Sequence, residues 1–260
     1  MARNLMVSAL VAASLGAAAF GAPAFGAPAA APANITAALG DAKRPPADSS
    51  RDMARKPAEL LALGEVKPGQ KVADFMMGGG YFTRILSAAV GPKGQVYAYQ
   101  SAEFVKFRAA YGTEQSTVVA DYKNVTPLTA PLSAVGLPEG LDLVLTVQNY
   151  HDLHLKPFPA GTAEAVNKQI FKALKPGGIY LVVDHAALAG APITVADTQH
   201  RIDEATVKTE VLAAGFKLVT EDNKLLGDPA DAHDKNVFDP AIRGKTDQFI
   251  LKFRKPKSAR

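Results

Sequence analysis

Short apolar runs alternate along the chain with longer segments in which apolar residues recur every three or four positions. The runs predict buried β-strands, because a strand covered by helices on both faces is apolar throughout. The predicted strands are Lys71–Phe75, Gln95–Gln100, Thr117–Ala120, Leu141–Val147, Ile179–Val183, Phe216–Thr220 and Gln248–Phe253. The segments between most of them predict helices. These are Tyr81–Val90, Glu103–Tyr111, Ala163–Leu174 and Arg201–Ala214.

Alternation of strands and helices predicts an α/β fold with a parallel, doubly wound sheet that binds ligands at the carboxyl ends of its strands. Two segments do not fit the alternation. Thr126–Gly140 is a proline-containing connection, and residues 222–246 form a long polar loop rich in Asp, Pro and Gly. Long irregular loops in compact domains are often lids or binding loops. An exposed excursion is equally compatible with the second segment.

The region before the first predicted strand contains one further helix. Ser49 or Ser50 can cap a helix over RDMARKPAELLALG, and Pro57 predicts a break inside it. We therefore expect the folded domain to span residues 49–255. The length of 260 residues suits one large domain.

Residues 1–33 have a different composition. One charge, Arg3, precedes a run of small apolar residues with Ala-Pro-Ala pauses. This is the pattern of a secretory signal followed by an Ala/Pro leader, and it predicts a protein exported to the periplasm or secreted. A membrane anchor is disfavoured, since Pro23 and Pro28 interrupt the run before a span of about 20 residues is reached.

Charge and cysteine content narrow the possible chemistry. The net charge is +4 and dispersed, and the short basic tail Lys252–Arg260 lacks a wider basic stripe or interleaved aromatic residues. Nucleic-acid binding is therefore not expected. The chain has no cysteine, which excludes disulfides, thiol catalysis and cysteine-ligated zinc.

A glycine turn stands between the first predicted strand and its helix, in the stretch VADFMMGGGYFT. Glycine lets the backbone approach a ligand, and the helix N-terminus offers free N–H groups to a phosphate or carboxylate. A nicotinamide-dependent oxidoreductase is disfavoured, because Thr83 stands where the dinucleotide fingerprint needs its third glycine. A purely structural turn is the alternative.

Six phrases follow one another at strand-sized spacings: KVADFMMGGGYFT, GPKGQVYAYQ, VVADYKN, GLDLVLTVQNYHDL, ALKPGGIYLVVDH and VLAAGFKLVTED. From about Pro57 to Lys255 the chain resembles the class I S-adenosylmethionine-dependent methyltransferases. With NYHDL, HRIDEA and FDPAIRGKTDQFILKF it is similar to a group of exported, predicted methyltransferases. The resemblance implies a mostly parallel seven-stranded sheet with an antiparallel last strand, S-adenosylmethionine as cofactor, and methyl transfer to a small-molecule acceptor.

The resemblance also implies which residues contact the cofactor. At its methionine end they would be Asp74, Gly78, Gly79 and Gly80. Gln100 stands where the family has an acid that binds the ribose hydroxyls, and Glu103 is the possible substitute. Asp121 would contact the adenine amino group. Beside the transferring methyl would lie Gln148, Asn149 and Tyr150.

Two departures from the family pattern favour a second hypothesis. Met76 occupies the place of the first glycine of the family turn, which leaves the cofactor less room, and Gln100 removes the common ribose anchor. The expected export also takes the protein away from the cytoplasm, where the cofactor is made. A non-catalytic exported binding protein on the same fold is therefore the alternative.

Histidines and an aspartate follow the fourth and fifth strands and supply candidates for the acceptor side. His151 is a candidate general base or acceptor-orienting group with Asp152 as its partner; each histidine could instead cap a strand end. The residues proposed to bind substrate are Tyr150, His185, His200 and Arg201. A metal site is conceivable, built from His151, Asp152, His154, His185 and His200. No close ligand spacing supports it, so none is predicted.

Overall fold

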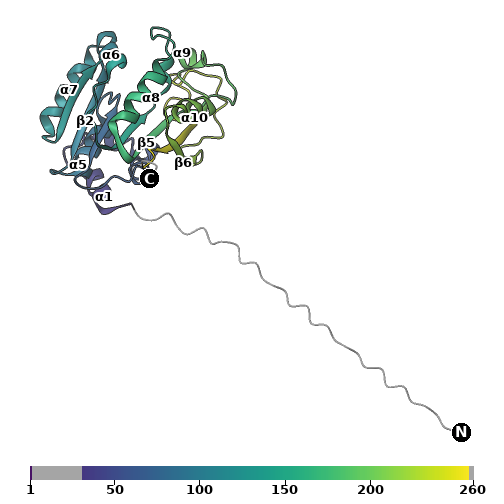
Figure 1. Cartoon of the computed structure of the whole chain (residues 1–260), viewed down its shortest axis with the longest axis horizontal. Coiled ribbons are helices and arrows are strands. Elements are labelled where there is room, and N and C mark those ends of the chain that lie inside the picture. The colour runs from purple at the N-terminus through teal and green to yellow at the C-terminus, as the bar shows by residue number, and fades with distance from the viewer. Residues whose placement is uncertain (2–30, 258–260) are drawn as a thin grey trace. The chain divides into compact units, whose positions relative to one another are not determined.

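Seven extended segments form one mixed β-sheet in the computed structural model, which describes Met1 and residues 31–257 (Figure 1). The strands are β1 (Lys71–Phe75), β2 (Gln95–Ser101), β3 (Val125–Ala130), β4 (Leu141–Val147), β5 (Leu174–His185), β6 (Lys217–Asp222) and β7 (Gln248–Arg254). Their order is β3-β2-β1-β4-β5-β7-β6. Strands β1 to β5 pair in parallel, whereas β7 is antiparallel to both β5 and β6. The predicted sheet is confirmed.

Helices cover both faces of the sheet, because side chains alternate along each strand. Along β5, Ile179 and Leu181 belong to one hydrophobic core, and Tyr180 and Val182 belong to the other. Residues of α1 (Ala33–Leu39), α4 (Pro57–Leu63), α5 (Tyr81–Val90) and α7 (Ala110–Asp121) fill the first core. Residues of α8 (Thr162–Ala173) and α10 (Glu204–Ala213) fill the second (Figure 1). The predicted doubly wound arrangement is therefore confirmed.

Shorter helices connect these elements. They are α2 (Pro46–Ser49), α3 (Asp52–Arg55), α6 (Ala102–Phe107), α9 (Val195–Gln199) and the 3₁₀ turns η1 (Leu132–Ala134) and η2 (His151–His154). The predicted break at Pro57 is confirmed, since Lys56 before it has a left-handed backbone with φ of 47°. The order of strands along the sheet reverses between β1 and β4, and a crevice at the carboxyl ends of strands around such a reversal commonly holds ligands.

The third strand lies elsewhere than predicted. Thr117–Ala120 is not a strand but the last part of α7, where Val118 packs in the first core. The actual third strand, β3, lies in the segment expected to be a connection, and it contains Pro127. As the last strand at this side of the sheet, β3 pairs only with β2, and an edge strand tolerates a proline that cannot donate a ladder hydrogen bond.

Two helices also differ from their predicted bounds. The expected helix Glu103–Tyr111 is divided, because α6 ends before Arg108 and α7 begins at Ala110. The helix expected from Arg201 begins only at Glu204, where the Asp203 side chain accepts a hydrogen bond from the backbone of Ala205 at 3.2 Å. Arg201 therefore precedes the helix, and its side chain is buried against Asp231.

The compact unit begins earlier than residue 49. Its described part begins at residue 31, and buried Ile35 and Ala38 of α1 belong to the first core. The predicted signal and leader, residues 1–33, fall mostly on residues 2–30, which lie outside the described part of the chain. Within residues 31–257, no helix has both the length and the apolar character needed to cross a bilayer.

Candidate active site

The turn between β1 and α5 has the glycine-type backbone that the sequence predicts, although its first residue is a methionine. Met76, Gly78 and Gly80 have φ of 62°, 53° and 81°. A non-glycine residue in this left-handed region costs about 1–2 kcal/mol, so the surrounding structure holds Met76 there. Part of that hold comes from Gln100, whose Oε1 accepts the backbone N–H of Gly78 at 3.0 Å.

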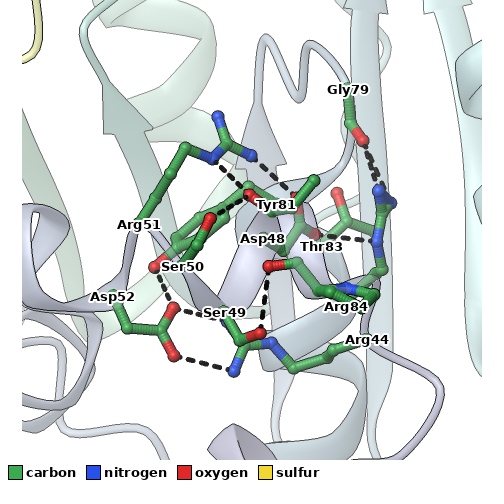
Figure 2. Close-up of polar contacts among 12 residues, drawn as sticks. Arg44, Asp48, Ser49, Ser50, Arg51, Asp52, Gly79, Tyr81, Thr83 and Arg84 are labelled. Atoms are coloured by element: carbon green, nitrogen blue, oxygen red, sulfur yellow. Dashed lines mark hydrogen bonds and ion pairs between the residues drawn. The ribbon is translucent and has the colours of Figure 1, made fainter.

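An N-terminal segment, residues 44–55, lies against this turn and against α5 (Figure 2). Arg84 of α5 donates to the carbonyl of Gly79 at 2.8 Å and pairs with Asp48 at 3.0 Å. Asp52 accepts hydrogen bonds from Tyr81 Oη and from Arg44, both at 2.6 Å. These contacts fix α3 above the glycine turn and thereby position two further arginines, Arg51 and Arg55.

A small cavity of about 190 Å³ lies between this segment and the carboxyl end of β1. Its charged groups are Arg51, Arg55 and Asp74. Asp74 is buried and accepts a hydrogen bond from Thr83 Oγ1 at 2.6 Å. Burial raises the pKa of Asp74 to about 6, although Thr83 and the charge of Arg55 act in the opposite direction. The cavity thus holds a poorly compensated carboxylate beside two cations.

Arg55 is a site residue that sequence reasoning missed. Its guanidinium lies over the rings of Tyr81 and Phe82, 4.5 and 5.1 Å from their centroids. Its Nε is buried and has no hydrogen-bond partner among the described residues. Burial lowers the pKa of Arg55 below its ordinary value. The only sequence signal is the basic composition of RDMARK, which resembles an ordinary solvated helix face.

A larger cavity of about 560 Å³ lies beside the small one. Gln148 and Asn149, which follow β4, line both cavities and form the wall between them. The lining of the larger cavity is mostly apolar: Phe104, Phe107, Tyr111, Leu155, Pro157, Phe158, Val237 and Phe238. Val237 and Phe238 come from the long loop between β6 and β7, so this loop lines the site and is not merely an exposed excursion.

A polar cluster forms one wall of the larger cavity. His151 Nδ1 lies 2.8 Å from Asp184 Oδ1, and its Nε2 lies 3.3 Å from Asp152 Oδ1. The same Asp152 oxygen is 3.8 Å from His200 Nδ1. Burial lowers the pKa of His151, but the charges of Asp184 and Asp152 outweigh it and raise this pKa to about 9. An imidazole that keeps its proton at neutral pH suits the role of acceptor-orienting donor better than that of general base.

His185, a candidate substrate-binding residue, also lines the larger cavity. Its Nδ1 lies 2.8 Å from Thr246 Oγ1. Burial lowers the pKa of His185 to about 3, although the neighbouring Asp184 acts in the opposite direction. His185 is therefore neutral where His151 is charged, and the two imidazoles offer a ligand opposite hydrogen-bonding properties.

Three of the predicted contact residues are buried and do not line either cavity. Gln100 is buried and bonded to the glycine turn. Tyr150 is fully buried, donates to Glu210 at 2.8 Å and accepts from Asn167 at 2.7 Å. Arg201 is also fully buried. It pairs with Asp231 at 2.9 Å and donates to two backbone carbonyls, so it anchors the long loop.

Asp121 differs most from its prediction. It ends α7 and does not follow the third strand, because β3 begins only at Val125. It therefore lies near the beginning of β3, whereas the two cavities lie at the carboxyl ends of the strands. Glu103, the expected substitute for Gln100, does line the larger cavity, and its carboxylate accepts the backbone N–H of Leu132 at 3.1 Å.

The remaining candidate residues lie at or beside the two cavities. Gly78 and Gly79 line the small cavity with Asp74, and Gly80 begins α5 directly behind them. His151, Asp152 and His200 have ligand atoms within 4.8 Å of one another. His154 stays outside this group and pairs with Glu210 at 3.1 Å.

No protein-family model matches the chain, and its similarity to solved structures is one of fold. A methyltransferase from Aquifex aeolicus, described as S-adenosylmethionine-dependent, aligns over 84% of this chain and 97% of its own, with 19% identity and a TM-score of 0.55. An arsenic(III) S-adenosylmethionine methyltransferase from Chlamydomonas reinhardtii aligns over 88% of this chain and 75% of its own, with 15% identity and a TM-score of 0.53.

A third similar structure, fibrillarin from Aeropyrum pernix, contains natively bound S-adenosyl-L-methionine. It aligns over 78% of this chain and 76% of its own, with 18% identity and a TM-score of 0.50. The strand order and the antiparallel β7 lead to the same fold as these alignments. The described part of the chain has the Rossmann-like fold of the S-adenosylmethionine-dependent methyltransferases.

Proposed function

We propose that this protein transfers the methyl group of S-adenosylmethionine to a small-molecule acceptor bound in the larger cavity. The observation that carries the proposal is the charge pattern of the small cavity, where Asp74 faces the same space as Arg51 and Arg55. The amino-acid end of S-adenosylmethionine carries one ammonium and one carboxylate. A buried acid and two arginines are complementary to such a pair of charges.

The chain fits this cofactor at three further points. Gly78 and Gly79 line the small cavity without side chains, and a Cβ at Gly78 would meet no atom within 4 Å. Gln148 and Asn149 line both cavities, so a cofactor whose amino-acid end lies in the small cavity would pass these two residues on its way to the larger one. Glu103, on the β2 side of the larger cavity, offers a carboxylate to hydroxyl groups.

When bound, S-adenosylmethionine supplies an electrophilic methyl on a sulfonium. The protein's part in such a reaction is mainly to align the acceptor and keep it close. His151, in its protonated form, directs Nε2–H at Asp152 on the wall of the larger cavity. Neutral His185 can accept a hydrogen bond from the acceptor. The aromatic side chains that line the larger cavity offer an apolar surface to the acceptor. We infer that the acceptor has an apolar body and one polar reacting group.

The test compares ligands that differ only in the amino-acid end. We expect S-adenosylmethionine and its demethylated product to bind, as measured by calorimetry. In Arg55→Gln and Asp74→Asn the affinity should fall about tenfold or more, which is about 1.4 kcal/mol. Binding of 5′-methylthioadenosine, which has no amino-acid end, should change less than about twofold in both variants.

Arg108→Gln is the matched control, since Arg108 is a half-exposed arginine paired with Glu114 and lines neither cavity. It should leave the affinity for all three ligands unchanged. The proposal fails if the wild-type protein binds none of the ligands. It also fails if Arg55→Gln weakens methylthioadenosine as much as S-adenosylmethionine.

A further inference from the structure

We propose that His151, Asp152 and His200 bind a divalent transition-metal ion, Zn²⁺ in the first instance, on the wall of the larger cavity. Sequence spacing argues against a metal site, because His200 lies far along the chain from the other two residues. The fold nevertheless brings the three residues together. η2 follows β4 and carries His151 and Asp152, while His200 comes from the end of α9.

The distances between ligand atoms suit such an ion. Nitrogen and oxygen ligands lie about 2.0–2.2 Å from Zn²⁺, which puts two of them about 3.3 Å apart in a tetrahedral site. His151 Nε2 and Asp152 Oδ1 are 3.3 Å apart. His200 Nδ1 is 3.8 Å from the same oxygen, and all three ligand atoms lie within 4.8 Å of one another. A small inward movement of His200 completes three corners of the tetrahedron.

Each of the three side chains is oriented by a neighbour, as ligands of metal sites usually are. Buried Asp184 lies 2.8 Å from His151 Nδ1 and leaves Nε2 to face Asp152. Asn149 donates to the second oxygen of Asp152 at 3.4 Å, so Oδ1 faces the imidazoles. The ring of Phe238 packs edge-on against His200, with centroids 4.8 Å apart.

The backbone of His200 helps to bring its side chain into the cluster. It has φ of 55°, a left-handed conformation. This conformation ends α9 and places the imidazole beside Asp152. A right-handed residue here would continue the helix.

The fourth position of the ion is open, because all three residues line the larger cavity. Two imidazoles and one carboxylate with an open position are typical of catalytic sites that bind a water molecule or a substrate oxygen. An ion here would displace the Nε2 proton of His151 into solvent, bind an oxygen of the acceptor and favour the deprotonated form of that oxygen. The metal site itself does not depend on the proposed methyl transfer, since it rests on this cluster alone.

The test measures Zn²⁺ binding to the metal-depleted protein by competition with a chromogenic chelator. We expect one ion per chain with a dissociation constant of about 1 μM or tighter. Co²⁺ in its place should give the visible absorption of a four- or five-coordinate ion. His200→Asn removes the imidazole but keeps a residue that tolerates the left-handed backbone. It should weaken binding at least about 100-fold, and Asp152→Asn at least about tenfold.

His154→Gln is the matched control, because His154 pairs with a carboxylate of Glu210 but lies outside the cluster. It should bind Zn²⁺ as the wild type does, and circular dichroism should show that all variants are folded. The proposal is overturned if the wild-type protein binds Zn²⁺ no more tightly than His200→Asn, or if His154→Gln loses binding to the same extent. Binding of S-adenosylmethionine, measured separately, reports on the other proposal.

Discussion

Asp74 and Asp184 stand at comparable places, near the carboxyl ends of β1 and β5, and both are buried. Their electrostatics are opposite. Burial raises the pKa of Asp74 to about 6, and among the described residues its hydrogen bonds come from Thr83 alone, through the side chain and the backbone. Burial also acts to raise the pKa of Asp184, but the charge and hydrogen bonds of His151 hold it below its ordinary value.

The difference separates two uses of a buried carboxylate. Asp184 accepts from the ring and the backbone of His151 and from the backbone of His185, so the protein itself satisfies it. Asp74 faces a cavity and is left with an unfavourable charge. A carboxylate in that condition gains most from a cationic ligand. The comparison thus assigns positioning to Asp184 and ligand binding to Asp74.

The largest expected effect is on stability at Asp184. Asp184→Asn removes the nearer of the two carboxylates beside buried His151 and should lower the free energy of unfolding by about 3–5 kcal/mol. Asp74→Asn at neutral pH should cost less than about 1 kcal/mol, or stabilise, because it removes a charge that burial disfavours. Urea unfolding of the two variants at pH 7 measures both. Equal losses would show that the two carboxylates are equivalent.

The second prediction concerns pH. The folded pKa of Asp74, about 6, lies above its ordinary value of 3.8, so between these pH values the native state holds a proton that the unfolded state has lost. The Asp74 contribution to the free energy of unfolding should therefore be fully present below about pH 4. It should fall as pH rises to about 6, by roughly 3 kcal/mol, and stay constant above that.

The difference in unfolding free energy between the wild type and Asp74→Asn isolates this contribution from other titrating groups. A difference that is flat between pH 4 and 7 would mean that Asp74 is well compensated, contrary to the comparison. A Thr83→Val variant sharpens the test. It removes the hydrogen bond that stabilises the carboxylate, so it should move the transition to higher pH.

The third prediction tests the turn that closes over Asp74. A Cβ on Gly80 would lie 2.5 Å from Val118 and 2.8 Å from Arg84, at a φ of 81°. Gly80→Ala should therefore lower the free energy of unfolding by about 2–3 kcal/mol. Gly78→Ala, with open space at its Cβ, should cost only about 1 kcal/mol. Thermal or urea unfolding of the pair gives the comparison, and similar costs would contradict it.

The smallest expected effect distinguishes Glu103 from Gln100 in binding. Glu103→Gln should weaken S-adenosylmethionine by about fivefold, or about 1 kcal/mol, because a charged acceptor is lost from the larger cavity. Gln100→Ala should mainly reduce stability, by about 1 kcal/mol, because it leaves the N–H of Gly78 without its partner. Calorimetry and unfolding of both variants measure the two quantities. A larger binding loss in Gln100→Ala would return the ribose role to Gln100.

The sequence predicts the fold well where the signals are local. β1, the glycine turn and α5 follow from an apolar run, three glycines and a helical period within twenty residues. β3 does not, because an edge strand alternates polar residues and tolerates Pro127, whereas Thr117–Ala120 has strand-like composition. Packing decides there: Val118 contacts the core from a helix, and Gln115 of the same helix bonds to the backbone of β2.

The candidate site was predictable to the same extent. Asp74, Gly78 and His151 lie in or shortly after strands, at the edge of the sheet where this topology commonly binds ligands. Arg55 belongs to a short helix whose position depends on ion pairs with α5, so no local pattern indicates its role. For Arg201 the sequence suggests a binding role that the structure does not support. Arg201 stands beside candidate His200, but its side chain is buried in an ion pair with Asp231.

The wall between the two cavities has a thermodynamic consequence. Gln148 has a left-handed φ of 62° and donates to Gln248 of β7 at 3.0 Å, and Asn149 donates to Asp152. Ligands in the small cavity and in the larger cavity would both contact Gln148 and Asn149. If the first ligand changes the affinity for the second by some factor, the second ligand changes the affinity for the first by the same factor. Donor and acceptor would thus bind as an energetically linked pair, with cooperativity set by two amide side chains.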